Sequence, residues 1–316
     1  MKLSKYLPLL GISIFVYIIL ATGPSKIFGS LKNINLGLFF LALLVIPPLV
    51  VLKAIKWQLI IKTYDVDYPL INAIKAWIVG FALGVITPGK VGDLFRSLYL
   101  KEDEGISLGR SLTTVVIDRL LDVSLLVVWA ILGISIFMSK FAFSGQFLII
   151  FLVAFVVLIL SIFVFSREDL LRKILKPFYL ALIPEKHQDS LSNHFNEFYL
   201  GFKTIVKDKH KLMTAVVLTF FIWFGSILQY YILTKALNLA VPFWFLMLIV
   251  PPTILVEILP ISFSGVGTRD ATLIFFLSFV AVTREAAVSL ALTILIIYYI
   301  MVATGFVIWW RNPIKI

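Results

Sequence analysis

The chain has 316 residues, of which 61% are hydrophobic and 14% are charged, and its net charge is +11. A soluble domain is typically about half apolar and about a quarter charged, so this composition excludes an ordinary soluble globular protein. The positive charge indicates loops rich in lysine and arginine on the cytoplasmic side of a membrane, and no nucleic-acid partner is expected. The sequence has no cysteine, which excludes disulfides and thiolate metal sites.

Continuous apolar runs make up most of the chain, and several are long enough for a helix to cross a hydrocarbon core of roughly 30 Å. Only helices and closed barrels satisfy their backbone polar groups in lipid, and these runs lack the short alternating strands of a barrel. We therefore predict an all-α polytopic membrane protein that forms one membrane domain over residues 1–316. About six full transmembrane helices are expected, over residues 7–21, 36–61, 112–138, 147–165, 212–237 and 286–310.

The first two spans carry local signals. The first follows Lys2 and Lys5 without a clear cleavage pattern, so a retained helix is expected rather than a signal peptide. Pro47 and the proline after it predict a kink in the second span. Lys53 and Lys56, near the end of the second span, are expected to extend toward the membrane surface.

Two further segments, 70–100 and 243–283, each contain short apolar pieces around a turn rich in glycine and proline. We predict that both are re-entrant helical hairpins that enter from opposite sides of the membrane. The turns are expected at Pro88, Gly89 and Gly92 in the first hairpin and at Pro260, Gly265 and Gly267 in the second. The alternative is a chain of ordinary spans joined by glycine and proline turns.

The distribution of positive charge supports the hairpin interpretation. If residues 70–100 crossed the membrane fully, the basic segment 166–211 would lie outside, against the positive-inside tendency. With a hairpin there, that segment and both termini are cytoplasmic in a multi-pass protein of the cell membrane. The halves, about 36–138 and 212–310, then form an inverted repeat of the kind found in many transporters.

The only long polar segment, residues 166–211, interleaves leucines and aromatic residues with its charges. This pattern predicts an amphipathic helix on the cytoplasmic membrane surface, with a small helical hairpin in water as the alternative. His187, His194 and His210 lie in this segment and lack a metal-ligand spacing. No metal and no cofactor are predicted.

Charged residues inside apolar segments are costly and usually functional. The first group, Lys90, Asp93 and Arg96, follows the first predicted turn; ordinary solvated loop charges are the alternative. In the second group, Asp118 and Asp122 are four residues apart and share a helix face with Arg119 close by. Arg119 can pair with a neighbouring element, and a structural interhelical ion pair is the alternative function of this group.

The third group lies in the second hairpin. Glu257 is embedded in an apolar run, where an unpaired carboxylate would be costly, and Arg269 is its natural partner. Asp270 begins the following helix, where a negative charge suits the helix dipole. The alternative for Asp270 is a simple helix cap.

These motifs together resemble a known family. They are residues 87–96 (TPGKVGDLFR), 118–122 (DRLLD) and 259–270 (LPISFSGVGTRD). In this order they are similar to the lysylphosphatidylglycerol synthase transmembrane-region family, the flippase-like membrane domain of the multiple peptide resistance factor. The resemblance spans residues 36–310. The family often has glutamate where this chain has Asp93, Asp118 and Asp270, a change that keeps the charge and shortens the side chain.

The resemblance implies lipid translocation or binding rather than aminoacyl transfer, because the synthases carry a further soluble domain for that reaction. We expect a flippase-like transporter, not an enzyme, for an anionic phospholipid or a polyprenyl-linked lipid. Lys90, Arg96, Arg119 and Arg269 would meet the headgroup. The five acidic residues would hold these cations in place or couple transport to protons: Asp93, Asp118, Asp122, Glu257 and Asp270.

Three rival functions stay open at this point. An integral membrane transferase for a lipid-linked substrate would need a base and a cation, for which Asp93 and Arg96 could serve. A scaffold that does not transport would use the charges as structural pairs only. An ion-coupled transporter of a small anion is a variant of the first hypothesis. Partners other than anionic lipids are not predicted, although the sequence leaves a homo-oligomer open.

Overall fold

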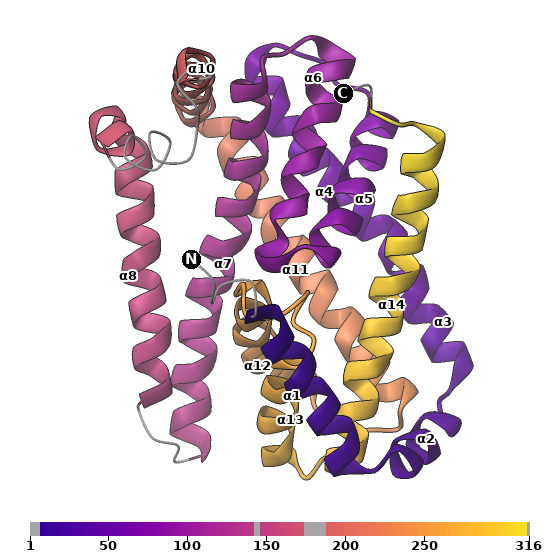
Figure 1. Cartoon of the computed structure of the whole chain (residues 1–316). Coiled ribbons are helices and arrows are strands. Elements are labelled where there is room, and N and C mark those ends of the chain that lie inside the picture. Colours follow the sequence, from indigo (N-terminus) through magenta and orange to yellow (C-terminus); the bar gives the residue numbers. More distant parts are fainter. Residues whose placement is uncertain (1–6, 142–145, 174–187, 315–316) are drawn as a thin grey trace.

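The computed structural model describes residues 7–141, 146–173 and 188–314 (Figure 1). Across these residues the regular structure is α-helix with short 3-10 segments, and no strand is present. The prediction of an all-α polytopic membrane fold is therefore confirmed. The N-terminal residues 1–6, which bear on the predicted cytoplasmic N-terminus, lie outside the described residues.

Four helical segments in the described part are long and apolar enough to cross a membrane. The first, Leu36–Tyr64, comprises α3 (Leu36–Leu44), α4 (Ile46–Ile61) and η2 (Lys62–Tyr64). The others are α7 (Leu108–Phe141), α11 (Lys209–Ala236) and α14 (Arg284–Arg311). A fifth span results if a bent helix pair at the N-terminus is counted as one. Six full spans therefore stay a prediction.

The bent pair consists of α1 (Leu7–Thr22) and α2 (Pro24–Lys32), which meet at an angle of 80°. The sequence predicts one span over 7–21, and the structure has a helix there that begins beside the second hairpin. Gly11 packs so closely on Ser262 and on the carbonyl of Val266 that a Cβ would collide with them. In Figure 1, α1 lies in the half of the fold that also contains α12 and α13.

The second span is interrupted for one residue at the position where the prolines predict a kink. Helix α3 ends at Leu44, and α4 begins at Ile46, so that Pro47 and Pro48 fall in the first turn of the new helix. Proline is tolerated there because the first backbone N–H groups of a helix have no intrahelical acceptor.

Two pairs of short helices form the predicted hairpins. The first consists of α5 (Leu70–Ile86), η3 (Pro88–Phe95) and α6 (Arg96–Glu104). The second consists of α12 (Phe243–Ile258), a turn over 259–267 and α13 (Thr268–Leu277), which continues into η5 (Ser278–Val280). At a rise of 1.5 Å per residue, α5 and α12 are each about 25 Å long, shorter than a hydrocarbon core.

The two hairpins enter from opposite ends of the fold and meet in its middle (Figure 1). The first comes from the end where α14 finishes, and the second comes from the end where α14 begins. Their tips touch, since a Cβ on Gly89 would lie 3.4 Å from the Cβ of Pro260. This arrangement agrees with an inverted repeat, while the predicted boundaries of the two halves stay a prediction.

Both tips depend on glycine for particular reasons. A Cβ on Gly92 would collide with the backbone carbonyl of Leu83 in α5, so η3 can approach α5 this closely only with glycine. Gly267, just before α13, has φ of 86°, a region that side chains disfavour. Pro88, Gly89, Pro260 and Gly265 also lie in the tips, as predicted.

The largest core cluster joins α7, α11, α12, α13 and α14, with Phe137 of α7 at the centre of several aromatic contacts. Helix α8 (Gln146–Ser166) packs on α7 and exposes apolar side chains such as Val153 and Leu160 on its other side. This exposure suits a lipid environment.

Helix α10 (Gln188–Lys207) lies within the predicted amphipathic segment and packs against the start of α7. Arg110 and Glu197 form an ion pair of 3.0 Å between the two helices, and the Thr113 hydroxyl donates to the Phe198 carbonyl at 2.8 Å. The position of this segment on the membrane surface stays a prediction. His187 lies outside the described residues.

Candidate functional site

A chain of alternating charges runs between α4, the first hairpin and α7. Three cations and three carboxylates take part, and each cation contacts at least one carboxylate. In order they are Arg96, Asp118, Lys56, Asp122, Arg119 and Asp93. The nitrogen–oxygen distances within this chain include 2.9 and 2.7 Å for Lys56 with its two aspartates and 2.6 Å for Arg119 with Asp93. Because three cations face three carboxylates, this set of six residues is electrically neutral.

Lys56 corrects a prediction made from the sequence. Its side chain does not extend toward the membrane surface but is buried, with only 1% of its area exposed, between Asp118 and Asp122. The two aspartates share a face of α7, as predicted, and that face turns toward α4. A buried ammonium requires such partners, because removing a charge from water costs several kcal/mol.

Arg96 also lies deep in this chain. It pairs with Asp118, and its guanidinium lies over the ring of Trp57 at 5.0 Å. The indole of Trp57 in turn donates to Thr114 at 3.0 Å. Arg96 is 1% exposed and does not line the cavity described below, so the structure does not bring it to the predicted headgroup position.

A second set of charges joins the two hairpins to α14. Lys90, at the tip of the first hairpin, pairs with Glu257 of α12 at 2.6 Å, and the Tyr298 hydroxyl donates to the same carboxylate at 3.3 Å. The partner predicted for Glu257 was Arg269, which instead pairs with its neighbour Asp270 at 2.7 Å. Arg269 lies at the start of α13, next to Asp270, and its guanidinium stacks over Tyr298 at 5.3 Å.

Asp270 has two functions in this structure. Its carboxylate accepts a 3.0 Å hydrogen bond from the Gly267 N–H, which is the predicted helix cap, and it also holds Arg269. Both residues are buried and do not line the cavity.

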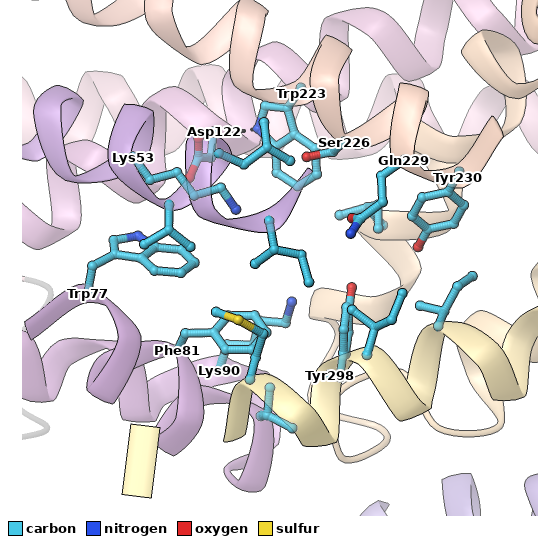
Figure 2. A pocket seen from close by; sticks show the side chains of 18 of the residues that line it. Lys53, Trp77, Phe81, Lys90, Asp122, Trp223, Ser226, Gln229, Tyr230 and Tyr298 are labelled. Carbon is cyan, nitrogen blue, oxygen red and sulfur yellow. Dashed lines mark hydrogen bonds between the residues drawn. The ribbon is translucent and has the colours of Figure 1, made fainter. Parts of the chain in front are cut away.

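A cavity of about 110 Å³ lies beside the first hairpin tip, between α4, α5, α7, α11, α12 and α14 (Figure 2). Its wall contains both charged and aromatic side chains, which lie next to one another. The charged residues in its wall are Lys53, Lys90, Asp93, Arg119 and Asp122, and the aromatic residues are Trp77, Phe81, Trp223, Tyr230 and Tyr298. Ser226 and Gln229 of α11 add neutral polar groups. Of the four predicted substrate-binding cations, Lys90 and Arg119 face this space.

Lys53 is the cavity cation that sequence reasoning missed. Its amino group lies over the rings of Trp77 at 4.6 Å and Trp223 at 5.8 Å, and it forms no ion pair with any residue that the structure describes. In Figure 2 it points into the open middle of the cavity. The sequence did contain a signal for its position. Lys53 and Lys56 are three residues apart and therefore share a helix face, so a buried Lys56 implies that Lys53 also faces the interior.

An apolar groove of about 510 Å³ shares one lining residue with the polar cavity. It runs between α7, α8 and α12, and all its lining residues but two are apolar, including Val123, Leu158 and Leu255. One of the two exceptions is Arg119, which lines both the groove and the cavity. Arg119 thus joins a polar site to a surface suited to hydrocarbon.

Residues 8–305 match the family described as the lysylphosphatidylglycerol synthase TM region. The chain belongs to this family. The match includes every charged residue of the site, from Lys53 to Asp270. The family assignment agrees with the resemblance drawn from the three motifs, and with the apolar helices it makes the chain a multi-pass membrane protein.

Two archaeal proteins are similar over nearly the whole length. The UPF0104 membrane protein PH1989 of Pyrococcus horikoshii is 23% identical over 313 residues, covering 93% of this chain and 92% of the relative. The UPF0104 membrane protein MJ1595 of Methanocaldococcus jannaschii is 27% identical over 305 residues, covering 93% and 90%. Their names describe membrane proteins and no substrate.

Within the described residues, no cluster of three or more histidine and acidic side chains is arranged to hold a metal ion. The carboxylates of this family member instead hold lysine and arginine. The chemistry that the arrangement offers is therefore the binding of a negative group by cations fixed in position.

Proposed function

We propose that this protein moves a lipid with an anionic headgroup between the two leaflets of the cell membrane and leaves the lipid chemically unchanged. The observation that carries the proposal is the cavity beside the meeting hairpin tips, with Lys53, Lys90 and Arg119 in its wall. Cations at this depth are costly unless they have a function or a partner. Here the carboxylates keep two of them in place, and a headgroup would complete the set.

The apolar groove favours a lipid over a small water-soluble anion. A lipid needs a polar site for its headgroup and a hydrocarbon surface for its chains, and Arg119 borders both. A transporter for a soluble anion would need only the first of these surfaces. The groove lies on the side of α8, whose outer face is apolar, so chains could stay in contact with the bilayer while the headgroup passes.

The two hairpins supply a way to change access. Broken helices that meet near the midplane are the usual binding elements of inverted-repeat transporters, which open alternately to each side. The Lys90–Glu257 ion pair, with a nitrogen–oxygen distance of 2.6 Å, connects the two hairpins. A negative headgroup bound nearby would weaken the attraction between Lys90 and Glu257 without replacing that carboxylate, and so loosen this connection.

The distribution of positive charge supports one orientation of the protein in the membrane. We propose that the end holding α6, α10 and Arg311 is cytoplasmic, because α10, which belongs to the basic segment, lies there.

Purified protein in vesicles that contain fluorescently labelled phosphatidylglycerol provides the test. Loss of outer-leaflet fluorescence to dithionite reports how fast the lipid exchanges leaflets. We expect exchange well above that of empty vesicles, and we expect Arg119→Gln to lower it at least about ten-fold, because charge-assisted hydrogen bonds are lost. Arg119→Lys, which keeps the charge, should retain part of the rate. Exchange equal to that of empty vesicles would reject the proposal, and a lipid product of altered mass would indicate a transferase.

A further inference from the structure

Among the residues that the structure describes, the charged groups around the cavity sum to one positive charge. The alternating chain from Arg96 to Asp93 contains equal numbers of cations and carboxylates. Lys90 is matched by Glu257, and Arg269 is matched by Asp270. Lys53 is left over.

Lys53 is placed to receive a ligand rather than to stabilise the fold by an ion pair. Its amino group is held between two tryptophan rings, which stabilise a cation while leaving its hydrogen-bond donors free for another group. It faces the same space as Lys90 and Arg119, whose charges are already matched by Glu257, Asp93 and Asp122.

We infer that Lys53 selects a headgroup with one negative charge, a phosphodiester, over a phosphomonoester and over a headgroup with no net charge. The inference rests on the proposed lipid function and deepens it. A phosphodiester neutralises Lys53 and leaves the buried site neutral. A phosphomonoester carries about −1.5 to −2 at neutral pH, so its second charge would have to displace a carboxylate from Lys90 or Arg119.

A headgroup with no net charge fails for the opposite reason. A phosphate that carries its own ammonium brings a positive charge together with its negative one, so the site would still hold one unmatched positive charge, that of Lys53. An unmatched charge in a desolvated site is strongly unfavourable. The two lipid classes left open by the sequence are thus narrowed to one chemistry: a phospholipid or a polyprenyl lipid qualifies if its phosphate is a diester, and a polyprenyl monophosphate does not.

Native mass spectrometry of lipid binding tests this inference without relying on transport. The protein is incubated with equal amounts of phosphatidylglycerol, phosphatidic acid and phosphatidylcholine that carry the same acyl chains. We expect phosphatidylglycerol to be retained at least about ten-fold over the other two, and we expect Lys53→Gln to abolish that preference. Lys53→Arg should keep it.

Lys140→Gln is the matched control, because Lys140 also lies over a tryptophan ring, Trp244 at 4.3 Å, but is exposed at the far end of α7. Equal retention of the three lipids by the unmodified protein, or an unchanged preference in Lys53→Gln, would overturn the inference. The comparison of lipids on the unmodified protein does not depend on whether the variant folds. Glycerophosphoglycerol, the same headgroup without chains, should not displace the lipid at equal concentration; displacement would show a site for a soluble anion instead.

The two proposals fail in different ways. Retention of phosphatidylglycerol through Lys53 with no leaflet exchange would keep the inference and reject translocation. Exchange of all three lipids at one rate, with no preference in binding, would keep translocation and reject the inference.

Discussion

At the scale of single residues, burial decides which charges stabilise the fold. Asp118 is 1% exposed and receives both Lys56 and Arg96, whereas Asp67 pairs with Lys62 in the open, with 85% of its side chain exposed. Exposed ion pairs contribute little because water and salt screen them. Removing one partner of a buried pair leaves an unmatched charge away from water, which is far more costly.

Asp118→Asn should therefore destabilise the protein by about 3–5 kcal/mol, because Lys56 and Arg96 lose a matched negative charge. Asp67→Asn removes the same group from a surface pair and should change stability by about 0–1 kcal/mol. Thermal unfolding of both variants in detergent measures the difference. Equal stability of the two would show that the alternating charge chain does not stabilise the fold.

At the scale of elements, the hairpin tips are the most constrained part of the chain. Two consecutive residues of η3, Gly89 and Lys90, have left-handed backbone conformations, with φ of 63° and 56°. The Thr87 hydroxyl accepts a 2.7 Å hydrogen bond from the Gly92 N–H and donates to the Leu83 carbonyl at 2.8 Å, which holds the turn closed. Strain of this kind in a non-glycine residue is typical of functional sites, and here the strained residue is the one that contacts Glu257.

Gly92→Ala should lower the free energy of unfolding by about 1–3 kcal/mol, because its Cβ would force η3 away from the Leu83 carbonyl. Gly29→Ala is the matched control. A Cβ on Gly29 in α2 meets nothing within 4 Å, and alanine favours a helix by up to about 1 kcal/mol. Denaturation of the two variants should move in opposite directions, and a stable Gly92→Ala protein would contradict the close approach of η3 to α5.

At the scale of the whole molecule, the direction of the fold can be tested because the chain has no native cysteine. In intact cells, an impermeant maleimide should label Arg284→Cys, at the proposed outer end of α14, and should not label Lys101→Cys in α6. Both positions are exposed, so a difference in labelling reports the side of the membrane. Labelling of Lys101→Cys from outside would reverse the proposed topology.

Much of the fold could be predicted from local signals, because span length, glycine turns and charge bias are properties of the sequence. The shared face of Asp118 and Asp122 follows from helix periodicity alone. Partners across helices could not be predicted in the same way: Glu257 meets Lys90, 167 positions away, rather than the nearer Arg269. The bend between α1 and α2 was also missed; it falls at Gly23, whose backbone has a φ of 90°.

The most direct test of the central claim is to lock the two hairpin tips together and measure lipid exchange. The Cβ positions of residues 89 and 260 lie 3.4 Å apart, close to the range of a disulfide, so Gly89→Cys with Pro260→Cys should form one on oxidation. Each single variant serves as a control. If lipid passes between the hairpins, the oxidised double variant should exchange phosphatidylglycerol no faster than empty vesicles, and reduction should restore the rate. Undiminished exchange by the oxidised protein would contradict the claim that the tips must separate for the lipid to cross.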